Sequence, residues 1–353
     1  MAMKHDGLSN LQYWRKQFLE CGQSLAFNPA TTEDFETWQE SFRAVFLECL
    51  GRLPAKPKNL NLHVLEEVET AEFVRKKIVY QADAYSVVPA YLFVPKTKNR
   101  EQSGAAIICP HGHGRGKDDT AGNTSKPADV DHVARYNYNY AEQFAVRGYV
   151  TLAPDLRCFG ERVDDPRVVY GHTEIEEGHH SCDINFVLGM LVGLNLLTLH
   201  VFDISRAVDL LSTIGQVDRN RIGCVGLSLG GTAALFSGAY DERIRVVGLS
   251  GYLNSWKNFP LVRGQICGSQ IVPSLLRYGD LSDVAGLICP RPLFVETAIN
   301  DPIFPIDGSR EAYKAVKKIY EASGHVDRLG REEFAGRHEF RGRKIFEFFD
   351  ELL

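Results

Sequence analysis

The sequence predicts an α/β fold with a mostly parallel central sheet, helices on both faces and an antiparallel hairpin at one edge. Two observations carry this prediction. From residue 105 onward, short apolar strands rich in β-branched residues alternate with helical segments, which is typical of a parallel sheet covered on both faces. Before that point, apolar runs over 73–80 and 87–94 flank a turn near Asp83, and this spacing indicates antiparallel strands.

The remaining elements follow in order along the chain. Further strands are predicted over 105–109, 149–153, 222–227, 244–249, 292–297 and 326–334. Helices are predicted over 136–147, 199–214, 309–322 and 340–353, with one more directly after the 222–227 strand. Because ligands bind at the carboxyl ends of such strands, functional residues are expected in the loops that follow them.

The chain divides into an extension and one large domain. Residues 1–60 are predicted to be a helical extension, and residues 61–353 form the main domain. Residues 31–34 offer N-caps for a helix over 35–50, whose apolar side chains recur every three or four positions. We expect this extension to pack on the main domain; a contact between subunits of a homo-oligomer is the alternative.

Composition excludes several classes of partner. The formal net charge is −5 and no basic stripe occurs, so no nucleic-acid partner is expected. The N-terminal segment lacks the apolar core of a signal peptide, and the most apolar run, 186–199, is too short to cross a bilayer. We interpret that run as a buried helix. Eight scattered cysteines without a C-x-x-C spacing fit reduced thiols and a cytoplasmic location without membrane association.

One motif organises the chemistry. Residues 226–230 read Gly-Leu-Ser-Leu-Gly between an apolar strand and a helix of small residues, which is the G-x-S-x-G pattern of a nucleophile on a sharp turn. A side chain two positions before or after Ser228 would collide with neighbouring backbone, and glycine removes that clash. A glycine-rich turn without a catalytic role is the alternative.

A serine nucleophile needs a base and an orienting acid. His338 lies in a loop after the last predicted strand, and Asp301 lies just past the 292–297 strand. The order Ser228, Asp301, His338 is that of the hydrolases with this motif. His325 precedes the last strand, at the wrong end of the sheet, and Glu296 falls within a strand, so both are rivals of lower rank.

An anionic intermediate needs backbone N–H donors. We assign them to Leu229, directly after the nucleophile, and to His113 in the glycine-rich loop 110–116, with Gly114 as the neighbouring alternative. His111 and His113 could instead bind a metal, with residues 179–183 as the other candidate cluster. No further ligands stand at a convincing spacing, so neither a metal nor an organic cofactor is expected.

Other residues near the expected site have weaker signals. Tyr252, Trp256 and Phe304 follow strands and are candidates for the pocket lining, with core packing as an equal account. Arg157 could brace the site loops through a buried ion pair or bind a substrate carboxylate. Residues 163–185 are polar and are predicted to form a small insertion or lid that shapes the pocket.

Taken together, five segments resemble the α/β-hydrolase superfamily, and within it the dienelactone-hydrolase-like and acetyl-xylan-esterase-like group. These segments are CPHGHGRGK (109–117), APDLRCFGER (153–162), RIGCVGLSLGG (221–231), RPLFVETAINDPIFP (291–305) and AGRHEF (335–340). The resemblance, which covers about 70–353, implies the α/β-hydrolase fold for the main domain, with residues 61–353 as its catalytic domain. Dienelactone hydrolases carry cysteine where this chain has Ser228, which argues against their substrate.

The resulting hypothesis is a serine carboxylesterase acting on small-molecule esters of short acyl groups, acetyl among them. A peptidase of the prolyl-oligopeptidase type is one alternative, although the chain has no room for the large propeller of those enzymes. A binding module without catalytic activity, on the same fold, is the other.

Overall fold

A nine-stranded sheet forms the centre of the fold. The computed structural model describes residues 9–28, 34–96, 104–164, 181–263 and 266–353. The strand order is β1-β2-β3-β5-β4-β6-β7-β8-β9. The pairs β1–β2, β2–β3 and β3–β5 are antiparallel, and the others are parallel. The strands are β1 (His63–Glu69), β2 (Phe73–Gln81), β3 (Val87–Pro95), β4 (Ala106–Ile108), β5 (Val150–Pro154), β6 (Ile222–Leu227), β7 (Ile244–Ser250), β8 (Leu293–Ala298) and β9 (Leu329–Phe334).

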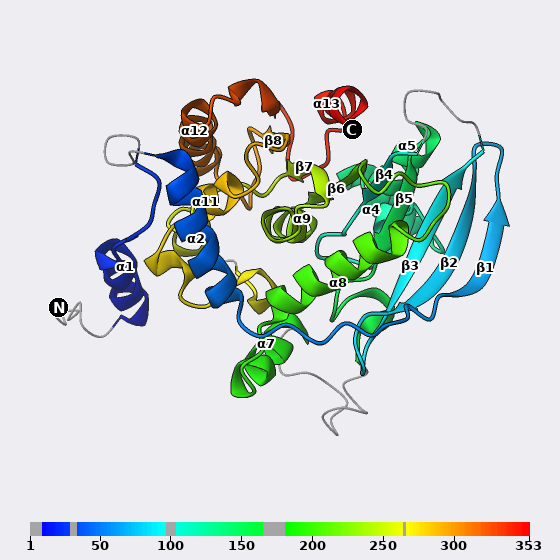
Figure 1. The fold of residues 1–353 in the computed structure, drawn as a ribbon, viewed down its shortest axis with the longest axis horizontal. Helices are drawn as coiled ribbons and strands as arrows, with labels where there is room; N and C mark the ends of the chain where they lie inside the picture. The colour runs from blue at the N-terminus through cyan, green and yellow to red at the C-terminus, as the bar shows by residue number, and fades with distance from the viewer. Residues whose placement is uncertain (1–8, 29–33, 97–103, 165–180, 264–265) are drawn as a thin grey trace.

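Helices cover both faces of this sheet (Figure 1). Helices α8 and α9 pack on one face, with α2 and α11 outside them, and α5 and α13 pack on the other. The α-helices are α1 (Asn10–Glu20), α2 (Phe35–Leu50), α3 (Lys117–Thr120), α4 (Pro127–Tyr136), α5 (Tyr140–Val146), α7 (Ser181–Leu191), α8 (Leu196–Leu211), α9 (Leu229–Tyr240), α10 (Phe259–Arg263), α11 (Leu281–Gly286), α12 (Ile306–Ala322) and α13 (Lys344–Leu352). Short 3-10 helices are η2 (Gly160–Arg162), η3 (Gly268–Gln270), η4 (Leu275–Arg277) and η5 (Val326–Arg328).

The alternation of side chains along the strands divides the core into two layers. Ala106 and Ile108 of β4 belong to the apolar cluster under α8 and α9, whereas Ile107 between them belongs to the cluster under α5 and α13. Because successive strand residues point to opposite faces, a strand apolar at every position is buried on both sides. The predicted fold class is confirmed.

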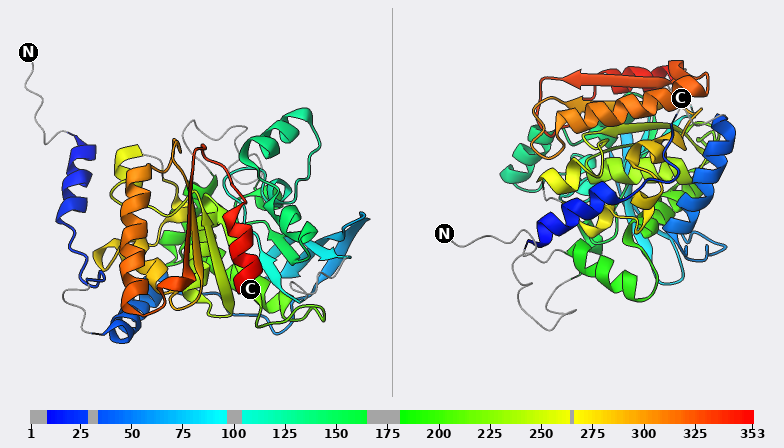
Figure 2. Two further views of the ribbon diagram at one scale, coloured as in Figure 1. Left: turned by 90° about the horizontal axis from the view of Figure 1, so that it is seen from above. Right: turned by 90° about the vertical axis from the view of Figure 1, so that its left-hand side faces the viewer.

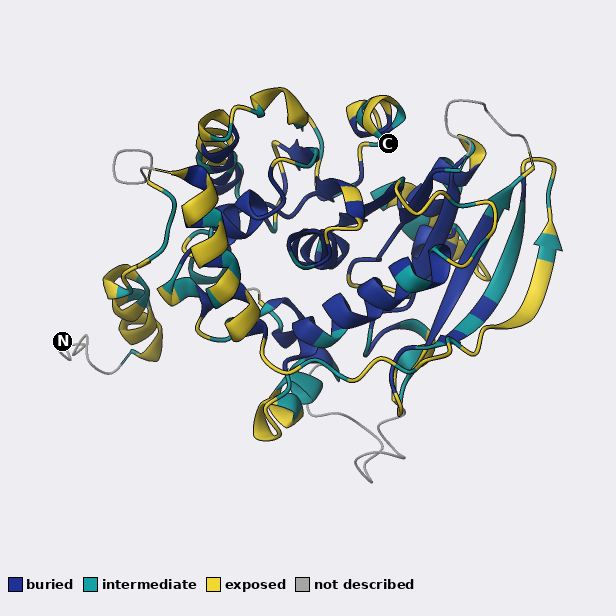
Figure 3. Cartoon of the chain, in the orientation of Figure 1, coloured by how far each residue is buried: buried dark blue, intermediate teal, exposed yellow. Residues whose placement is uncertain are grey.

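Helix α2 has the apolar face that its sequence predicts. Its buried residues are Phe35, Trp38, Phe42, Phe46 and Leu50. The Asp34 carboxylate caps the helix by accepting from the amide of Thr37 at 3.1 Å, and Gly51 ends it with a φ of 74°. Phe46 packs against Phe236 of α9 with ring centroids 6.1 Å apart. Helix α1, in contrast, has no buried residue and lies at the outside of the fold (Figures 2 and 3).

Two helix predictions were wrong. The segment 136–147 is not one helix: α4 ends at Tyr136, Asn137 adopts a left-handed conformation with a φ of 45°, and α5 begins at Tyr140. The apolar run 186–199 is broken between Leu191 and Leu196, and α7 and α8 meet at an angle of 98°. Only α8 is buried; the side chain of Leu191 is 78% exposed. The apolar composition of 186–199 therefore did not predict which of its residues are buried.

Several boundaries also moved. Strand β1 was not predicted, because its sequence is not a continuous apolar run: three of its seven residues are glutamates, and most of the strand is exposed at the sheet edge. The last strand begins at Leu329, after η5, and the closing helix begins only at Lys344.

Most of the predicted 163–185 insertion lies outside the described residues. Among the described residues no single helix is both long and apolar enough to cross a membrane; the bent pair α7 and α8 meets the length and composition criteria only jointly.

Candidate active site

Ser228 stands on the sharp turn that the motif predicts. It lies between β6 and α9 with φ 61° and ψ −122°, a backbone conformation that residues other than glycine rarely adopt. A Cβ on Gly226 would lie 2.2 Å from the carbonyl carbon of Gly230, and a Cβ on Gly230 would lie 2.2 Å from the oxygen of Pro110. Both glycines are therefore required by backbone contact, and the local geometry expected of 226–230 is confirmed.

His338 and Asp301 meet at the carboxyl end of the sheet. The Nδ1 atom of His338 lies 2.7 Å from Oδ2 of Asp301, and both residues are largely buried. The other carboxylate oxygen, Oδ1, accepts from the amides of Ile303 at 2.7 Å and Phe304 at 3.0 Å. The Phe304 ring also stacks on the His338 ring at 5.7 Å. The acid is thus fixed by backbone donors, and it orients the imidazole.

The two rival residues have other positions. Glu296 is buried within β8, where it accepts from the Ser250 hydroxyl and from the amides of Arg341 and Gly342. Glu296 therefore holds the backbone just beyond His338. Burial raises the pKa of the Glu296 carboxyl group to about 7. His325 precedes β9, so it lies at the opposite end of the sheet.

A cavity of about 700 Å³ opens at Ser228 and His338. Of the three aromatic residues suggested for its lining, Phe304 lines it. Tyr252 and Trp256 do not, which corrects the prediction: both are buried in the core, and Tyr252 contacts Phe304 from behind at 5.7 Å. The lining further includes His113, Tyr136, Tyr138, Phe159, Cys182, Asp183, Phe259, Cys267 and Gln270.

The loop after β4 runs close to the serine. A Cβ on Gly112 would lie 3.2 Å from Cβ of Ser228 and 2.4 Å from the Tyr138 hydroxyl. The loop backbone at Gly112 therefore approaches Ser228 closely, and a side chain at this position would not fit. Leu229 is the first residue of α9, so its amide lies at the helix N-terminus. The tyrosines of the 136–140 segment were not predicted to be near the site.

Buried polar contacts hold this loop in place. The His111 Nε2 accepts from the amide of Leu156 at 3.0 Å, and its Nδ1 lies 2.6 Å from the Gly112 oxygen. Both ring nitrogens are engaged within the loop framework, so His111 is not placed to bind a metal. Nearby, the Lys117 ammonium pairs with Asp155 at 2.9 Å, with both side chains fully buried.

Arg157 braces the adjacent loop. Its guanidinium forms two hydrogen bonds of 2.9 Å to the Asp203 carboxylate and one of 2.8 Å to Asp83. This bidentate pairing uses the geometry that arginine matches best. Of the two roles considered for Arg157, the structure therefore supports the structural ion pair. Arg157 does not line the cavity, as binding of a substrate carboxylate would require.

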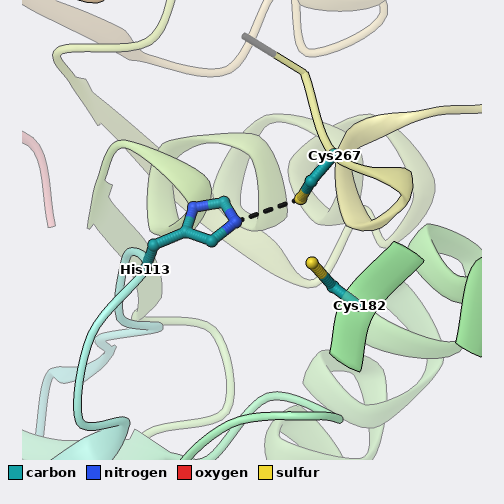
Figure 4. A group of neighbouring side chains, drawn as sticks. All are labelled: His113, Cys182 and Cys267. Carbon is teal, nitrogen blue, oxygen red and sulfur yellow. Dashed lines mark hydrogen bonds between the residues drawn. The ribbon is translucent and has the colours of Figure 1, made fainter. Parts of the chain in front are cut away.

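A group of possible metal ligands also lines the cavity. His113, Cys182 and Cys267 bring one imidazole nitrogen and two sulfur atoms within 4.8 Å of one another (Figure 4). His113 and Cys182 were singled out from the sequence but Cys267 was not, because Cys267 lies far from both in the chain. The structure therefore places two possible further ligands beside His113 that the spacing in the sequence did not reveal. His179 and His180, the other candidates, lie outside the described residues.

Comparison with known proteins places the chain in a family. The model of the Abhydrolase family matches residues 15–337. The chain belongs to the Abhydrolase family. This Abhydrolase protein is 25% identical over 290 residues to the Bacillus subtilis (strain 168) protein named "Putative hydrolase YtaP", an overlap of 81% of this chain and 89% of that protein.

Solved structures share the fold of this Abhydrolase chain. One, from Bacteroides fragilis NCTC 9343 and described as a "putative acetyl xylan esterase", superposes with a TM-score of 0.75 at 18% identity, covering 94% of this chain and 84% of that one. The glucuronoyl esterase from Solibacter usitatus gives a TM-score of 0.64 at 17% identity, covering 93% and 96%. The expected α/β-hydrolase fold is thereby confirmed.

Proposed function

We propose that this protein is a serine carboxylesterase in which Ser228 is the nucleophile, His338 the general base and Asp301 the orienting acid. The observation that carries the proposal is the 2.7 Å hydrogen bond between His338 and Asp301 at the cavity that Ser228 also lines. A base fixed by a carboxylate, beside a serine on a strained turn, is the arrangement that activates a hydroxyl group.

The proposed reaction uses these residues in turn. His338 Nε2 takes the Ser228 proton as the hydroxyl oxygen attacks the ester carbonyl. The amides of Leu229 and His113 stabilise the oxyanion, since backbone donors in place before the reaction need no reorganisation. His338 then protonates the leaving alcohol. A water molecule, deprotonated by His338, hydrolyses the acyl-enzyme and regenerates Ser228.

Short acyl groups, acetyl among them, are the proposed substrates. Two of the structurally similar proteins are named acetyl xylan esterases, which favours a small acyl group on a bulky alcohol. The cavity of about 700 Å³ has room for such an alcohol. Phe259, Ile303 and Phe304 give the cavity an apolar wall beside His338.

Covalent labelling tests the esterase mechanism. A fluorophosphonate probe should form one adduct, which peptide mapping places on Ser228, and Ser228→Ala should prevent it. The same variant should lose p-nitrophenyl acetate turnover while keeping the circular dichroism spectrum of the parent. A folded parent protein that takes up no probe, or a variant that retains turnover, would refute the assignment and leave the non-catalytic binding module as the better account.

A substrate series tests the acyl preference separately. We expect kcat/KM to fall at least tenfold from p-nitrophenyl acetate to the octanoate, and acetylated xylose to be hydrolysed. Faster turnover of a glucuronoyl ester than of any acetyl ester would replace the short-acyl proposal and leave the esterase class intact. Preferential cleavage of prolyl peptides would instead support the peptidase alternative.

A further inference from the structure

The cavity wall contains three side chains that the esterase mechanism does not use. His113 comes from the loop after β4, Cys182 from the first turn of α7, and Cys267 from the residue before η3. Figure 4 shows the three side chains pointing toward one another from separate segments. Nε2 of His113 lies 3.0 Å from Sγ of Cys267.

The Cys267 sulfur lies among polar neighbours at the cavity wall. It is 2.6 Å from the Ser269 hydroxyl and 3.0 Å from the His113 ring nitrogen. The Cys182 sulfur lies within 4.8 Å of both the Cys267 sulfur and the His113 nitrogen. Sulfur and imidazole nitrogen, gathered at this spacing, are the atoms through which cysteine and histidine bind metals.

The surrounding contacts hold these side chains together. The carboxylate of Asp183, next to Cys182, accepts from the amide of Gly268, next to Cys267, at 2.7 Å. Phe186 packs over Gly268 so closely that a Cβ there would lie 2.2 Å from it. The His113 ring meets the Phe159 ring edge to face at 5.3 Å. The ligand atoms are therefore positioned by the fold and do not depend on an ion to bring them together.

We propose that His113, Cys182 and Cys267 bind one thiophilic d¹⁰ cation of the Zn²⁺ class, with a fourth coordination position open to the cavity. Two sulfurs and one imidazole nitrogen are ligands that zinc prefers, and three protein ligands leave one position of its tetrahedron free. Zinc bond lengths place tetrahedral ligand atoms about 3.5–3.8 Å apart, which small side-chain rotations reach from separations below 4.8 Å. The free position faces the cavity because all three residues line it.

Binding has a defined proton balance. Zn²⁺ accepts electron pairs from the sulfurs of Cys182 and Cys267 and from Nε2 of His113. The S–H bonds of the two cysteines break and both protons pass to solvent, while the imidazole keeps its proton on Nδ1. No oxidant or reductant takes part. The site does not require Ser228 chemistry, so it stands or falls separately from the esterase proposal.

Zinc titration against a competing chromophoric chelator tests the site. Reduced, metal-free protein should bind one Zn²⁺ per chain with release of about two protons. Loss of partners that only orient a metal ligand costs 10–100-fold in affinity, so Cys182→Ser, Cys267→Ser and His113→Gln should each weaken binding by roughly 100-fold or more. Cys49→Ser and His132→Gln are the matched controls and should bind like the parent, as should Ser228→Ala. Parent protein without a bound equivalent, or ligand variants that bind normally, would overturn the proposal.

A measurement on the unmodified protein guards against variants that fail to fold. Alkylation followed by peptide mapping should show that Zn²⁺ slows the modification of Cys182 and Cys267 by at least tenfold, whereas Cys21 and Cys49 are modified at an unchanged rate. Co²⁺ should produce the intense visible bands of a tetrahedral thiolate site, and azide should shift them if the fourth position is open. Unprotected thiols, or a Cys182–Cys267 disulfide as the only change and no zinc uptake after reduction, would overturn the proposal.

Discussion

The imidazole of His338 and the carboxylate of Asp301 meet at 2.7 Å although the two residues are 37 positions apart in the chain. Strands β8 and β9 are parallel neighbours, so the loops that follow them emerge at the same edge of the sheet. Asp301 comes from the first loop and His338 from the second. The pairing is thus a consequence of strand order.

Asp301→Asn should reduce kcat for p-nitrophenyl acetate by roughly 10³–10⁴-fold, because the amide favours the wrong imidazole tautomer. Stability should change little, since the amide oxygen can still accept from the Ile303 and Phe304 amides. Steady-state kinetics and urea unfolding check the two parts. Asp307→Asn is the matched control, because the Asp307 side chain is 90% exposed; an equal loss in both variants would argue against the orienting role.

Ser228→Gly should raise stability while abolishing turnover. Ser228 has a φ of 61°, and such a conformation costs about 1–3 kcal/mol in a residue with a side chain. Glycine relieves this strain but loses about 0.4–1 kcal/mol through the greater freedom of the unfolded chain. We expect a net gain of about 1 kcal/mol in the free energy of unfolding, measured in urea with an unchanged m-value. A less stable variant would show that the turn is not strained.

Gly112→Ala should impair catalysis more than substrate binding. The new Cβ would lie 2.4 Å from the Tyr138 hydroxyl and 3.2 Å from Ser228 Cβ, so the loop must shift and carry the His113 amide with it. Loss of one oxyanion donor costs about 10²–10³ in kcat, and a partial displacement should cost at least tenfold. Gly215→Ala, where nothing lies within 4 Å, is the control. Unchanged kcat in Gly112→Ala would exclude this loop from the oxyanion site.

Glu296→Gln should change how stability depends on pH. Burial raises the folded-state pKa of Glu296 from 4.5 to about 7, so the folded protein binds the extra proton between these values. The contribution of Glu296 to stability therefore declines as pH rises from about 4.5 to 7. The free energy of unfolding of Glu296→Gln, relative to that of the parent, should therefore rise by on the order of 2–3 kcal/mol across that range. Urea unfolding of both proteins at pH 5 and pH 7.5 measures this rise. The same difference in stability between variant and parent at both pH values would mean that Glu296 is ionised throughout.

Local patterns in the sequence predicted much of the fold. The spacing of apolar residues in 35–50 identified the buried face of α2, and the glycines at 226 and 230 identified the turn at Ser228. These features depend on periods and steric limits within a few residues. The break at Asn137 and the exposure of α7 were missed, because which apolar segments become buried depends on the neighbours they find.

The fold class and the chain order of Ser228, Asp301 and His338 could be predicted from the amino-acid sequence, since they depend on local periodicity and on the residues after each strand. Which aromatic side chains face the cavity depended on three-dimensional packing, which places Phe304 there and Tyr252 behind it. It also brought Cys267 to His113 and Cys182. Contacts between residues far apart in the chain leave no periodic signal, because they arise from how separate segments pack together.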